Sequence, residues 1–227
     1  MPKSLSIIIP AYNEEKNIEN AVLHNLETIS SLGFDFEIII VNDGSSDSTA
    51  VKAKALISRS PAIRFIDHPR NLGLGAAIST GIKSVTKEYV IFSPCDSPFD
   101  REDLESFATE MGKADLIIGY REARPGYTRF MLLSSRVYNL LIRLLFGIKV
   151  KDINWIHMYR TKIFEKIKIE ASGVFMIAEV VVKAKRLDYS IAEVPCKMKL
   201  RVHGRASASK ISVILKTIRE LIKFLFI

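Results

Sequence analysis

Cysteine is scarce in this chain, and its placement argues against a cysteine-based zinc site. Cys95 and Cys196 are the only two cysteines among 227 residues. They lie far apart in the sequence and match none of the paired spacings typical of zinc ligands. We therefore expect two free thiols, which is consistent with a reducing cytoplasm.

Long apolar runs are also missing. The first apolar stretch, residues 5–9, ends at Pro10 and is too short for a signal peptide or a membrane span. No internal repeat or low-complexity segment is visible. With 48% hydrophobic residues, the chain can bury a substantial core as one large domain or two small ones.

Acidic residues are outnumbered by basic ones, which gives a net charge of +8. This excess suggests an anionic partner: nucleic acid, an acidic membrane surface or a phosphorylated small molecule. Aromatic residues are not interleaved with the basic ones, so we expect no nucleic-acid partner.

One stretch predicts both a strand end and a site. The β-branched run at residues 38–41 reads as a buried strand, and Asn42-Asp43-Gly44-Ser45 stops it. The chain then enters a helix, with Asp47 or Ser48 as the N-cap. Ligands of open parallel sheets bind beyond the carboxyl ends of strands, where Asp43 falls. An ordinary turn is the alternative, because these residue types suit any tight turn.

Strands and helices alternate along most of the chain. We expect strands at residues 5–9, 36–41, 64–67, 89–92, 116–119, 156–159 and 191–194. We expect the main helices at residues 15–32, 48–58, 130–146, 176–187 and 209–226, with another from the glycine-rich turn to residue 85. This alternation predicts an α/β fold, a doubly wound and mostly parallel sheet with helices on both faces.

Two further turns are candidates for binding. Glycines in residues 71–75 let the backbone approach a ligand, and the helix that follows favours an anion at its N-terminus. Ile78 replaces the last small residue of the dinucleotide fingerprint, so we reject an NAD site. Asp96 lies in the turn after the fourth strand with no helix to cap, whereas Asp100 and Asp103 fit a structural capping arrangement.

Two helices carry apolar residues at helical spacing. The helix at residues 130–146 also has a polar stripe with Arg136, Asn139 and Arg143, which offers cations for a phosphate or simply a solvated surface. The last helix is amphipathic and basic, as is typical of a helix on a membrane surface. A core-packing or oligomer-forming helix is its alternative, and its very apolar end favours the membrane.

These motifs resemble the family 2 glycosyltransferases. The resemblance rests on Ile7-Ile8-Ile9-Pro10-Ala11-Tyr12-Asn13-Glu14-Glu15, Val41-Asn42-Asp43-Gly44-Ser45-Ser46-Asp47-Ser48-Thr49 and Asn71-Leu72-Gly73-Leu74-Gly75. It is strongest for the dolichyl-phosphate mannose synthase and polyprenyl-phosphate glycosyltransferase branch. It implies a GT-A fold with a nucleotide-sugar-binding portion at residues 1–120 and an acceptor-binding portion of the same domain at 121–208. The amphipathic helix described above, residues 209–227, follows these two portions.

The resemblance also implies roles for particular residues. On the donor side these are Pro10, Ala11, Tyr12, Glu14, Asp43 and Gly73. Asp96 matches the second acid of the metal-binding Asp-x-Asp. On the acceptor side, facing a lipid phosphate, are Arg121, Arg129, Ser135 and Asn139. Asp152 and Glu179 match two further family acids, and Arg201 and Ser207 match a segment that closes over the diphosphate.

The chain departs from the family pattern at the metal site. Pro94 and Pro98 replace two usual metal-contacting residues, so Asp96 is the one expected ligand for Mg²⁺ or Mn²⁺. Magnesium is often bound by one or two carboxylates together with substrate phosphates. Trp155-Ile156-His157 replaces a Ser-Gly-Phe sequence, and Ala208 replaces a lysine.

The implied activity is inverting transfer of a hexose from GDP-mannose or a UDP-sugar to a polyprenyl or dolichyl phosphate. The catalytic residues would be Asp96 and Arg201, with His203 and Arg205 adding positive charge. No histidine or isolated acid is placed as a general base, and a phosphomonoester needs little such help because its second pKa is about 6. The protein would be cytoplasmic and peripheral on the cytoplasmic membrane face.

Two alternatives remain open at this point. The first is a family 2 transferase that acts on a saccharide hydroxyl in glycan or polysaccharide assembly. The second is a non-catalytic nucleotide-sugar-binding module, which Pro94 and Pro98 suggest.

Overall fold

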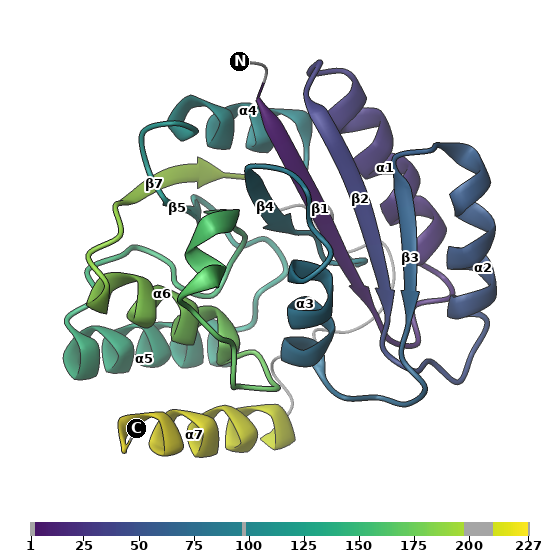
Figure 1. Ribbon diagram of the computed structural model, residues 1–227. Helices are drawn as coiled ribbons and strands as arrows, with labels where there is room; N and C mark the ends of the chain where they lie inside the picture. Colours follow the sequence, from purple (N-terminus) through teal and green to yellow (C-terminus); the bar gives the residue numbers. More distant parts are fainter. Residues whose placement is uncertain (1–2, 97–98, 198–210, 227) are drawn as a thin grey trace.

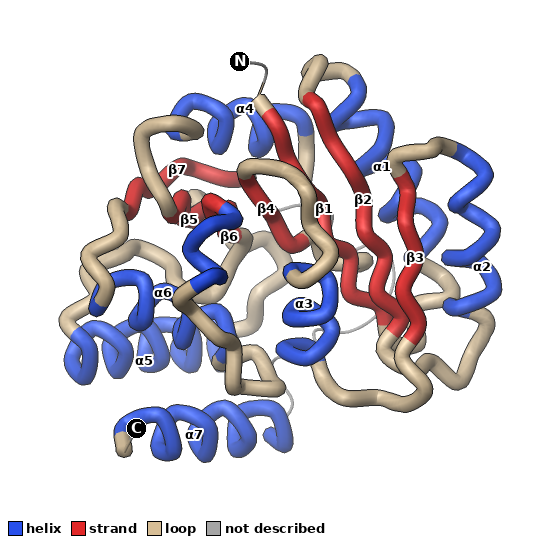
Figure 2. Tube along the Cα trace, in the orientation of Figure 1, coloured by secondary structure: helices blue, strands red, loops and turns tan. Residues whose placement is uncertain are grey.

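The computed structural model describes residues 3–96, 99–197 and 211–226. Its centre is a seven-stranded sheet with the order β3-β2-β1-β4-β6-β5-β7 (Figures 1 and 2). The strands are β1 (Ser4–Ala11), β2 (Asp35–Asn42), β3 (Ile63–Asp67), β4 (Tyr89–Phe92), β5 (Leu116–Arg121), β6 (His157–Arg160) and β7 (Ile191–Cys196). Strand β6 runs antiparallel to β4 and β5, and the other neighbouring pairs are parallel. The predicted mostly parallel sheet is confirmed.

Helices cover both faces of the sheet, as predicted. They are α1 (Ile18–Ser30), α2 (Thr49–Ala55), α3 (Leu74–Ile82), α4 (Arg101–Glu110), α5 (Arg129–Phe146), α6 (Met176–Arg186) and α7 (Ile211–Leu225), with 3₁₀ helices at Leu56–Arg59 and Thr161–Glu165. Successive side chains of β1 alternate between the faces. Ile7 and Ile9 join the core under α1, α2 and α4, whereas Ile8 joins the core under α3, α5, α6 and α7.

Local signals set several helix ends where the sequence predicts them. Gly147 ends α5 in the left-handed conformation with φ of 67°, and its N–H bonds to the Arg143 carbonyl. Asp100 and Asp103 form a capping box at the start of α4. At the start of α2, Ser48 is the N-cap by position, but the Asp47 carboxylate accepts the Thr49 N–H.

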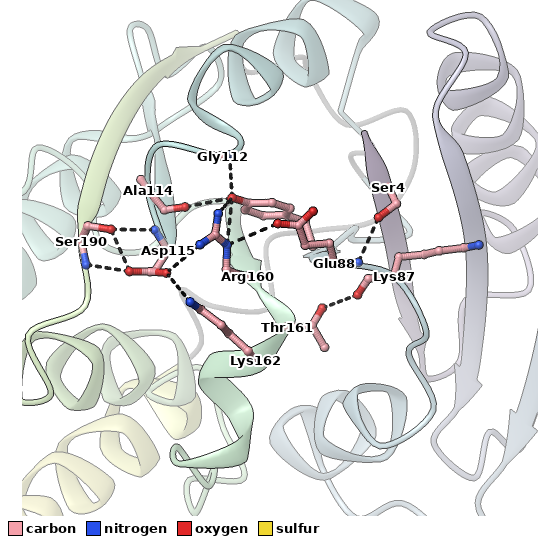
Figure 3. Close-up of polar contacts among 11 residues, drawn as sticks. Ser4, Lys87, Glu88, Gly112, Ala114, Asp115, Arg160, Thr161, Lys162 and Ser190 are labelled. Carbon is pink, nitrogen blue, oxygen red and sulfur yellow. Dashed lines mark hydrogen bonds and ion pairs between the residues drawn. The ribbon is translucent and has the colours of Figure 1, made fainter. Parts of the chain in front are cut away.

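A polar network holds the strands at the edge where β4 and β5 begin (Figure 3). The Tyr89 hydroxyl donates to the Ala114 carbonyl and accepts bonds from the Gly112 N–H and the Arg160 guanidinium. Arg160 also pairs with Asp115, which accepts a 2.8 Å bond from the Ser190 hydroxyl. Burial would raise the pKa of Asp115, but these bonds and nearby cations lower it below its usual value. The network therefore ties β4, β5, β6 and the start of β7 together.

The two C-terminal-half helices α5 and α7 lie next to each other at the lower edge of the molecule in Figure 1. Phe146 of α5 and Phe224 of α7 make an edge-to-face contact with ring centroids 5.6 Å apart. Leu221 and Phe224 are the buried side chains of α7, and Ile142 is the buried one of α5. Much of the apolar surface of both helices is therefore exposed. Within the described residues, no helix is long and apolar enough to cross a bilayer.

Candidate functional site

The carboxyl ends of β1, β2 and β4 lie at one edge of the sheet, because these three strands are adjacent and parallel. The strand order reverses between β1 and β4, which makes this edge the usual ligand crevice of an open α/β sheet. The loops after β1 and β2 are bonded together: the Asn13 N–H donates to the Ser45 hydroxyl, and the Ser46 N–H donates to the Asn13 side chain. Figure 1 shows this edge at the lower ends of β1 and β2.

Asp43 connects this edge to the glycine-rich turn. Its buried carboxylate accepts the Leu72 N–H at 3.0 Å and the Gly73 N–H at 2.8 Å. His68 Nδ1 lies 2.8 Å from the same carboxylate, and His68 Nε2 lies 2.9 Å from the Thr80 hydroxyl. The resemblance places Asp43 on the donor side, and in the structure its oxygens accept bonds from the glycine-rich turn. This network comes from residues 25 to 30 positions away, which no local pattern indicates.

Glycine is required where the glycine-rich turn meets other backbone segments. A Cβ on Gly75 would lie 1.9 Å from the Ala171 carbonyl oxygen, and a Cβ on Gly44 would lie 2.2 Å from the Arg70 backbone. Gly73 has φ of 97°, a conformation that side-chain-bearing residues rarely adopt. These close approaches bring the turn against both the Asn42-Asp43-Gly44 stop and the loop before α6.

The other predicted donor-side residues lie at the same edge. Pro10 and Ala11 end β1, and the exposed Tyr12 follows them. The Cys95 thiol lies 3.5 Å from the Pro10 carbonyl. Burial raises the pKa of this thiol well above its ordinary value, and the charges of Glu14 and Asp96 raise it further. Glu14 and Asp96 therefore both lie within electrostatic reach of Cys95, on neighbouring strand ends.

The acidic residues at this edge fit a metal ion that the protein would hold only in part, with a bound diphosphate supplying the other ligands. Among the described residues, no group of three or more histidine, cysteine, aspartate or glutamate side chains forms a metal site. Asp96, the one expected ligand, suits a hard divalent cation that takes its remaining oxygens from a diphosphate.

A second cluster surrounds Asp152. Arg121 donates two bonds to its carboxylate, at 2.6 and 2.9 Å, and Arg124 lies 3.0 Å away. Burial by itself would raise the pKa of Asp152, but the bonds and charge of Arg121 and the charge of Arg124 hold that pKa below its usual range. Arg121 also stacks on the Trp155 ring at 4.7 Å. Two guanidinium groups around one carboxylate leave a net positive charge.

Three of the predicted acceptor-side residues make contacts around this cluster. The Arg121 side chain is only 4% exposed and is engaged by Asp152. Ser135 on α5 accepts a bond from Arg124, and Asn139 accepts the Ile153 N–H at 3.0 Å. Arg129 lies exposed at the start of α5.

Arg124 is the residue that sequence reasoning missed. Its side chain is 18% exposed, against 4% for Arg121, so it is the more accessible of the two guanidinium groups. It lies in the loop before α5, where no helical or strand periodicity marks it. Its spacing of three from Arg121 is the one signal in the sequence.

The remaining predicted residues have other placements. Glu179 is buried and accepts the backbone N–H groups of Glu170 and Ala171, so it holds the loop before α6. Arg201 and Ser207, with His203 and Arg205, lie outside the described residues. His157 is buried, and burial lowers its pKa to about 4 despite the opposing charge of Asp152, so it is neutral near pH 7.

The sheet order and the crevice at its switch point define the class of the protein: an α/β fold of the GT-A type. The chain belongs to glycosyl transferase family 2, whose family model matches residues 6–169. The resemblance seen in the three motifs is therefore confirmed at the level of family and fold.

Two curated relatives illustrate the range of the family. The chain is 29% identical over 169 residues to dodecaprenyl-phosphate galacturonate synthase of Rhizobium johnstonii, covering 73% of this chain and 50% of that protein. It is 29% identical over 201 residues to glycosyltransferase AglD of Haloferax volcanii, covering 84% of this chain and 32% of that protein. The chain thus spans half or less of the length of these relatives.

Solved structures support the fold. Glucosyl-3-phosphoglycerate synthase from Mycobacterium tuberculosis, in complex with Mn²⁺, uridine diphosphate and glucosyl-3-phosphoglycerate, superposes with a TM-score of 0.76 at 20% identity. The match covers 99% of this chain and 81% of that one. A second structure of the same enzyme holds Mg²⁺ and uridine diphosphate, at 18% identity, a TM-score of 0.76 and coverage of 99% and 80%.

Proposed function

We propose that this chain transfers a hexose from a nucleotide-diphosphate sugar to a polyprenyl or dolichyl phosphate, with inversion at the anomeric carbon. The donor would be GDP-mannose or a UDP-sugar. One observation carries the proposal. The carboxyl ends of β1, β2 and β4 lie at one edge of the sheet, and Asp43, which follows β2, bonds to the glycine-rich turn there. Family membership and the name of the Rhizobium relative support the reaction class.

On the donor side, Pro10, Ala11, Tyr12, Glu14, Asp43 and Gly73 would form the nucleotide pocket. The Leu72, Gly73 and Gly75 amides of the glycine turn are bonded within the protein, so the positive end of α3 would be what favours the negative charge of a diphosphate here. Asp96 would hold Mg²⁺ or Mn²⁺, which supplies positive charge to the leaving diphosphate when bound. The Mn²⁺ and Mg²⁺ complexes of the mycobacterial enzyme support a divalent cation in this fold.

On the acceptor side, the positive charge around Asp152 would hold the lipid phosphate. Arg124 and Arg129 are exposed enough to contact it, while Arg121 and Asn139 fix the Asp152 loop behind them. A phosphate oxygen would attack C1 of the sugar, and the bond from C1 to the diphosphate would break with its electron pair leaving on the nucleotide. Because the phosphomonoester is already anionic near pH 7, this step needs no general base.

A membrane surface would present the lipid to this site. Most of the exposed large apolar side chains in the described residues belong to the adjacent helices α5 and α7. On α7 they are Ile211, Leu215, Ile218, Ile222 and Leu225, with Phe226 directly after the helix, and on α5 they are Phe130, Leu133, Val137, Leu140, Leu141, Leu144 and Leu145. Such a surface next to basic side chains fits an interfacial position on an anionic bilayer. The protein would then be peripheral on the cytoplasmic face.

An activity assay tests the reaction. The chain is incubated with GDP-mannose, UDP-glucose and other UDP-sugars, with a short polyprenyl phosphate, and with or without Mg²⁺ or Mn²⁺. We expect one donor to give equal amounts of nucleoside diphosphate and lipid-linked sugar. Equal activity on a soluble sugar acceptor would instead favour the saccharide-hydroxyl transferase. Donor binding with no turnover on any acceptor would favour the non-catalytic module.

Membrane attachment has its own prediction. Changing Leu215, Ile218 and Ile222 of α7 together to serine removes three apolar side chains that we place in the lipid. Each is worth more than about 1 kcal/mol when buried, so the amount bound to phosphatidylglycerol-containing liposomes should fall by about tenfold or more in a sedimentation assay.

The control is Val51→Ser, which changes an apolar side chain that is more exposed than these three but lies on α2. Its sedimentation should equal that of the wild type. Unchanged sedimentation of the α7 triple variant would contradict the membrane proposal.

A further inference from the structure

Helix α7 contacts the rest of the molecule through the Glu220 carboxylate as well as through the buried side chains of Leu221 and Phe224. Oε1 of Glu220 accepts three bonds from the loop before α6: the Ser172 N–H at 3.1 Å, the Ser172 hydroxyl at 3.1 Å and the Gly173 N–H at 3.0 Å. Bonds to a charged acceptor are stronger than neutral ones. Glu220 therefore fixes the position of backbone that lies outside its own helix.

The backbone of the same loop packs directly against the glycine-rich turn. The Gly75 N–H donates to the Ser172 carbonyl at 3.1 Å. A Cβ on Gly73 would lie 2.7 Å from that carbonyl oxygen, and one on Gly75 would lie 1.9 Å from the Ala171 carbonyl oxygen. The two backbone segments touch with no side chain between them, so a shift of residues 171–173 must move the turn.

The turn is held on its other side by Asp43, through the Leu72 and Gly73 N–H groups. A continuous set of contacts thus runs from Glu220 through Ser172 and the glycine turn to the end of β2. We infer that Glu220 is a positioning residue for the donor site, holding the loop that sets the glycine turn. This inference rests on the proposed donor role of that turn.

Gly173 offers a second way to disturb the same contact. A Cβ at this position would lie 2.8 Å from Glu220 Oε2 and 3.3 Å from the end of Lys216. Both are ends of flexible side chains, and Gly173 does not have a positive φ. Gly173→Ala should therefore displace the Glu220 carboxylate at little cost to the fold. The carboxylate needs this glycine for its close approach.

The experiment compares Glu220→Ala, Gly173→Ala and Glu220→Gln in the full 227-residue chain without membranes. One readout is hydrogen exchange at the Leu72, Gly73 and Gly75 amides. The other is the Kd of UDP and of GDP, measured by calorimetry with Mn²⁺ present. The matched control is Glu105→Ala, which removes an exposed carboxylate of α4 that pairs with Arg101.

We expect Glu220→Ala and Gly173→Ala each to speed exchange at these amides and to raise the Kd of the bound nucleotide by about tenfold, because small displacements of positioning groups are costly. Combining them should add little, since they break one contact. Glu220→Gln keeps an acceptor oxygen and should recover most of the affinity. Glu220→Ala also leaves the Ser172 and Gly173 amides without this acceptor, so its melting temperature should fall modestly, and Glu220→Gln should restore most of the loss.

Each contrary outcome has a distinct meaning. A lower melting temperature with unchanged Kd would make Glu220 merely structural and overturn the inference. Unchanged amide exchange in Glu220→Ala would overturn it as well. A wild-type chain that binds neither UDP nor GDP would overturn the proposed function and the donor role of Glu220 with it, whatever the exchange data show.

Discussion

Asp96→Ala is expected to lower glycosyl transfer by about 100-fold or more, with the folded structure retained. Asp96 follows β4 at the sheet edge where the donor would bind, and it is the acid that we expect to hold a divalent cation. Without it, the negative charge that develops on the leaving diphosphate loses its main partner on the protein. Initial rates of nucleoside diphosphate release, with Mn²⁺ varied, measure the effect.

Asp35→Ala is the matched control for this prediction. Asp35 begins β2 at the opposite edge of the sheet, and its half-exposed carboxylate pairs with Lys87. Its removal should leave the rate unchanged. If Asp96→Ala transfers sugar at the wild-type rate, Asp96 has no catalytic role. If both variants bind donor equally and the wild type never turns over, the chain is a binding module.

Asp152→Asn is expected to destabilise the fold by about 3–5 kcal/mol, the usual cost of breaking a buried ion pair. The Asp152 and Arg121 side chains are 2% and 4% exposed, so solvent cannot replace the lost charge. The substitution leaves Arg121 buried and Arg124 half-buried without their shared anion. Urea unfolding followed by circular dichroism measures the change in the free energy of unfolding.

Glu105→Gln provides the comparison at an exposed pair. Glu105 bonds to Arg101 on the surface of α4, where such pairs contribute less than about 1 kcal/mol. If Asp152→Asn and Glu105→Gln lowered the free energy of unfolding by similar amounts, the Asp152 cluster would not be important for stability.

The Asp152 contribution should also depend on pH. Its pKa is lowered in the folded protein, so the folded state binds a proton there less readily than the unfolded chain does. The contribution is therefore complete above the ordinary carboxyl pKa of about 3.9 and is lost as the pH falls below it, through the lower folded value. The gap in unfolding free energy between wild type and Asp152→Asn should be constant from pH 7 to about pH 5 and should shrink in more acidic solution.

The secondary structure followed from the sequence wherever the signal was local. The β-branched run at residues 38–41 became the buried part of β2, and Asn42-Asp43-Gly44 ended it. Gly147 ended α5 and the Asp100–Asp103 pair capped α4, because each signal acts within a turn of its own helix. The doubly wound, mostly parallel class of the sheet followed from the alternation of strands and helices, whereas the place of β6 between β4 and β5, antiparallel to both, did not.

The candidate site was only partly predictable. Strand ends of a parallel sheet share an edge, so Ala11, Asp43 and Asp96 could be expected together. The partners of these groups could not be expected, since His68 and the Leu72 and Gly73 amides reach Asp43 only after three elements have packed. Arg121 reads as an exposed phosphate ligand in the sequence, and its burial against Asp152 depends on a loop 31 residues away.

The sequence by itself determined the family, the strand and helix order, and the turns that end the strands, because these depend on residue types at short spacing. The tertiary structure alone decided which apolar residues are covered. The last helix carries apolar residues nearly all along it, yet Leu221 and Phe224 are buried while Ile218 and Ile222 face outward. Residue type shows that a side chain is apolar, and periodicity shows on which face of the helix it lies. The surface that covers it comes from residues distant in the chain.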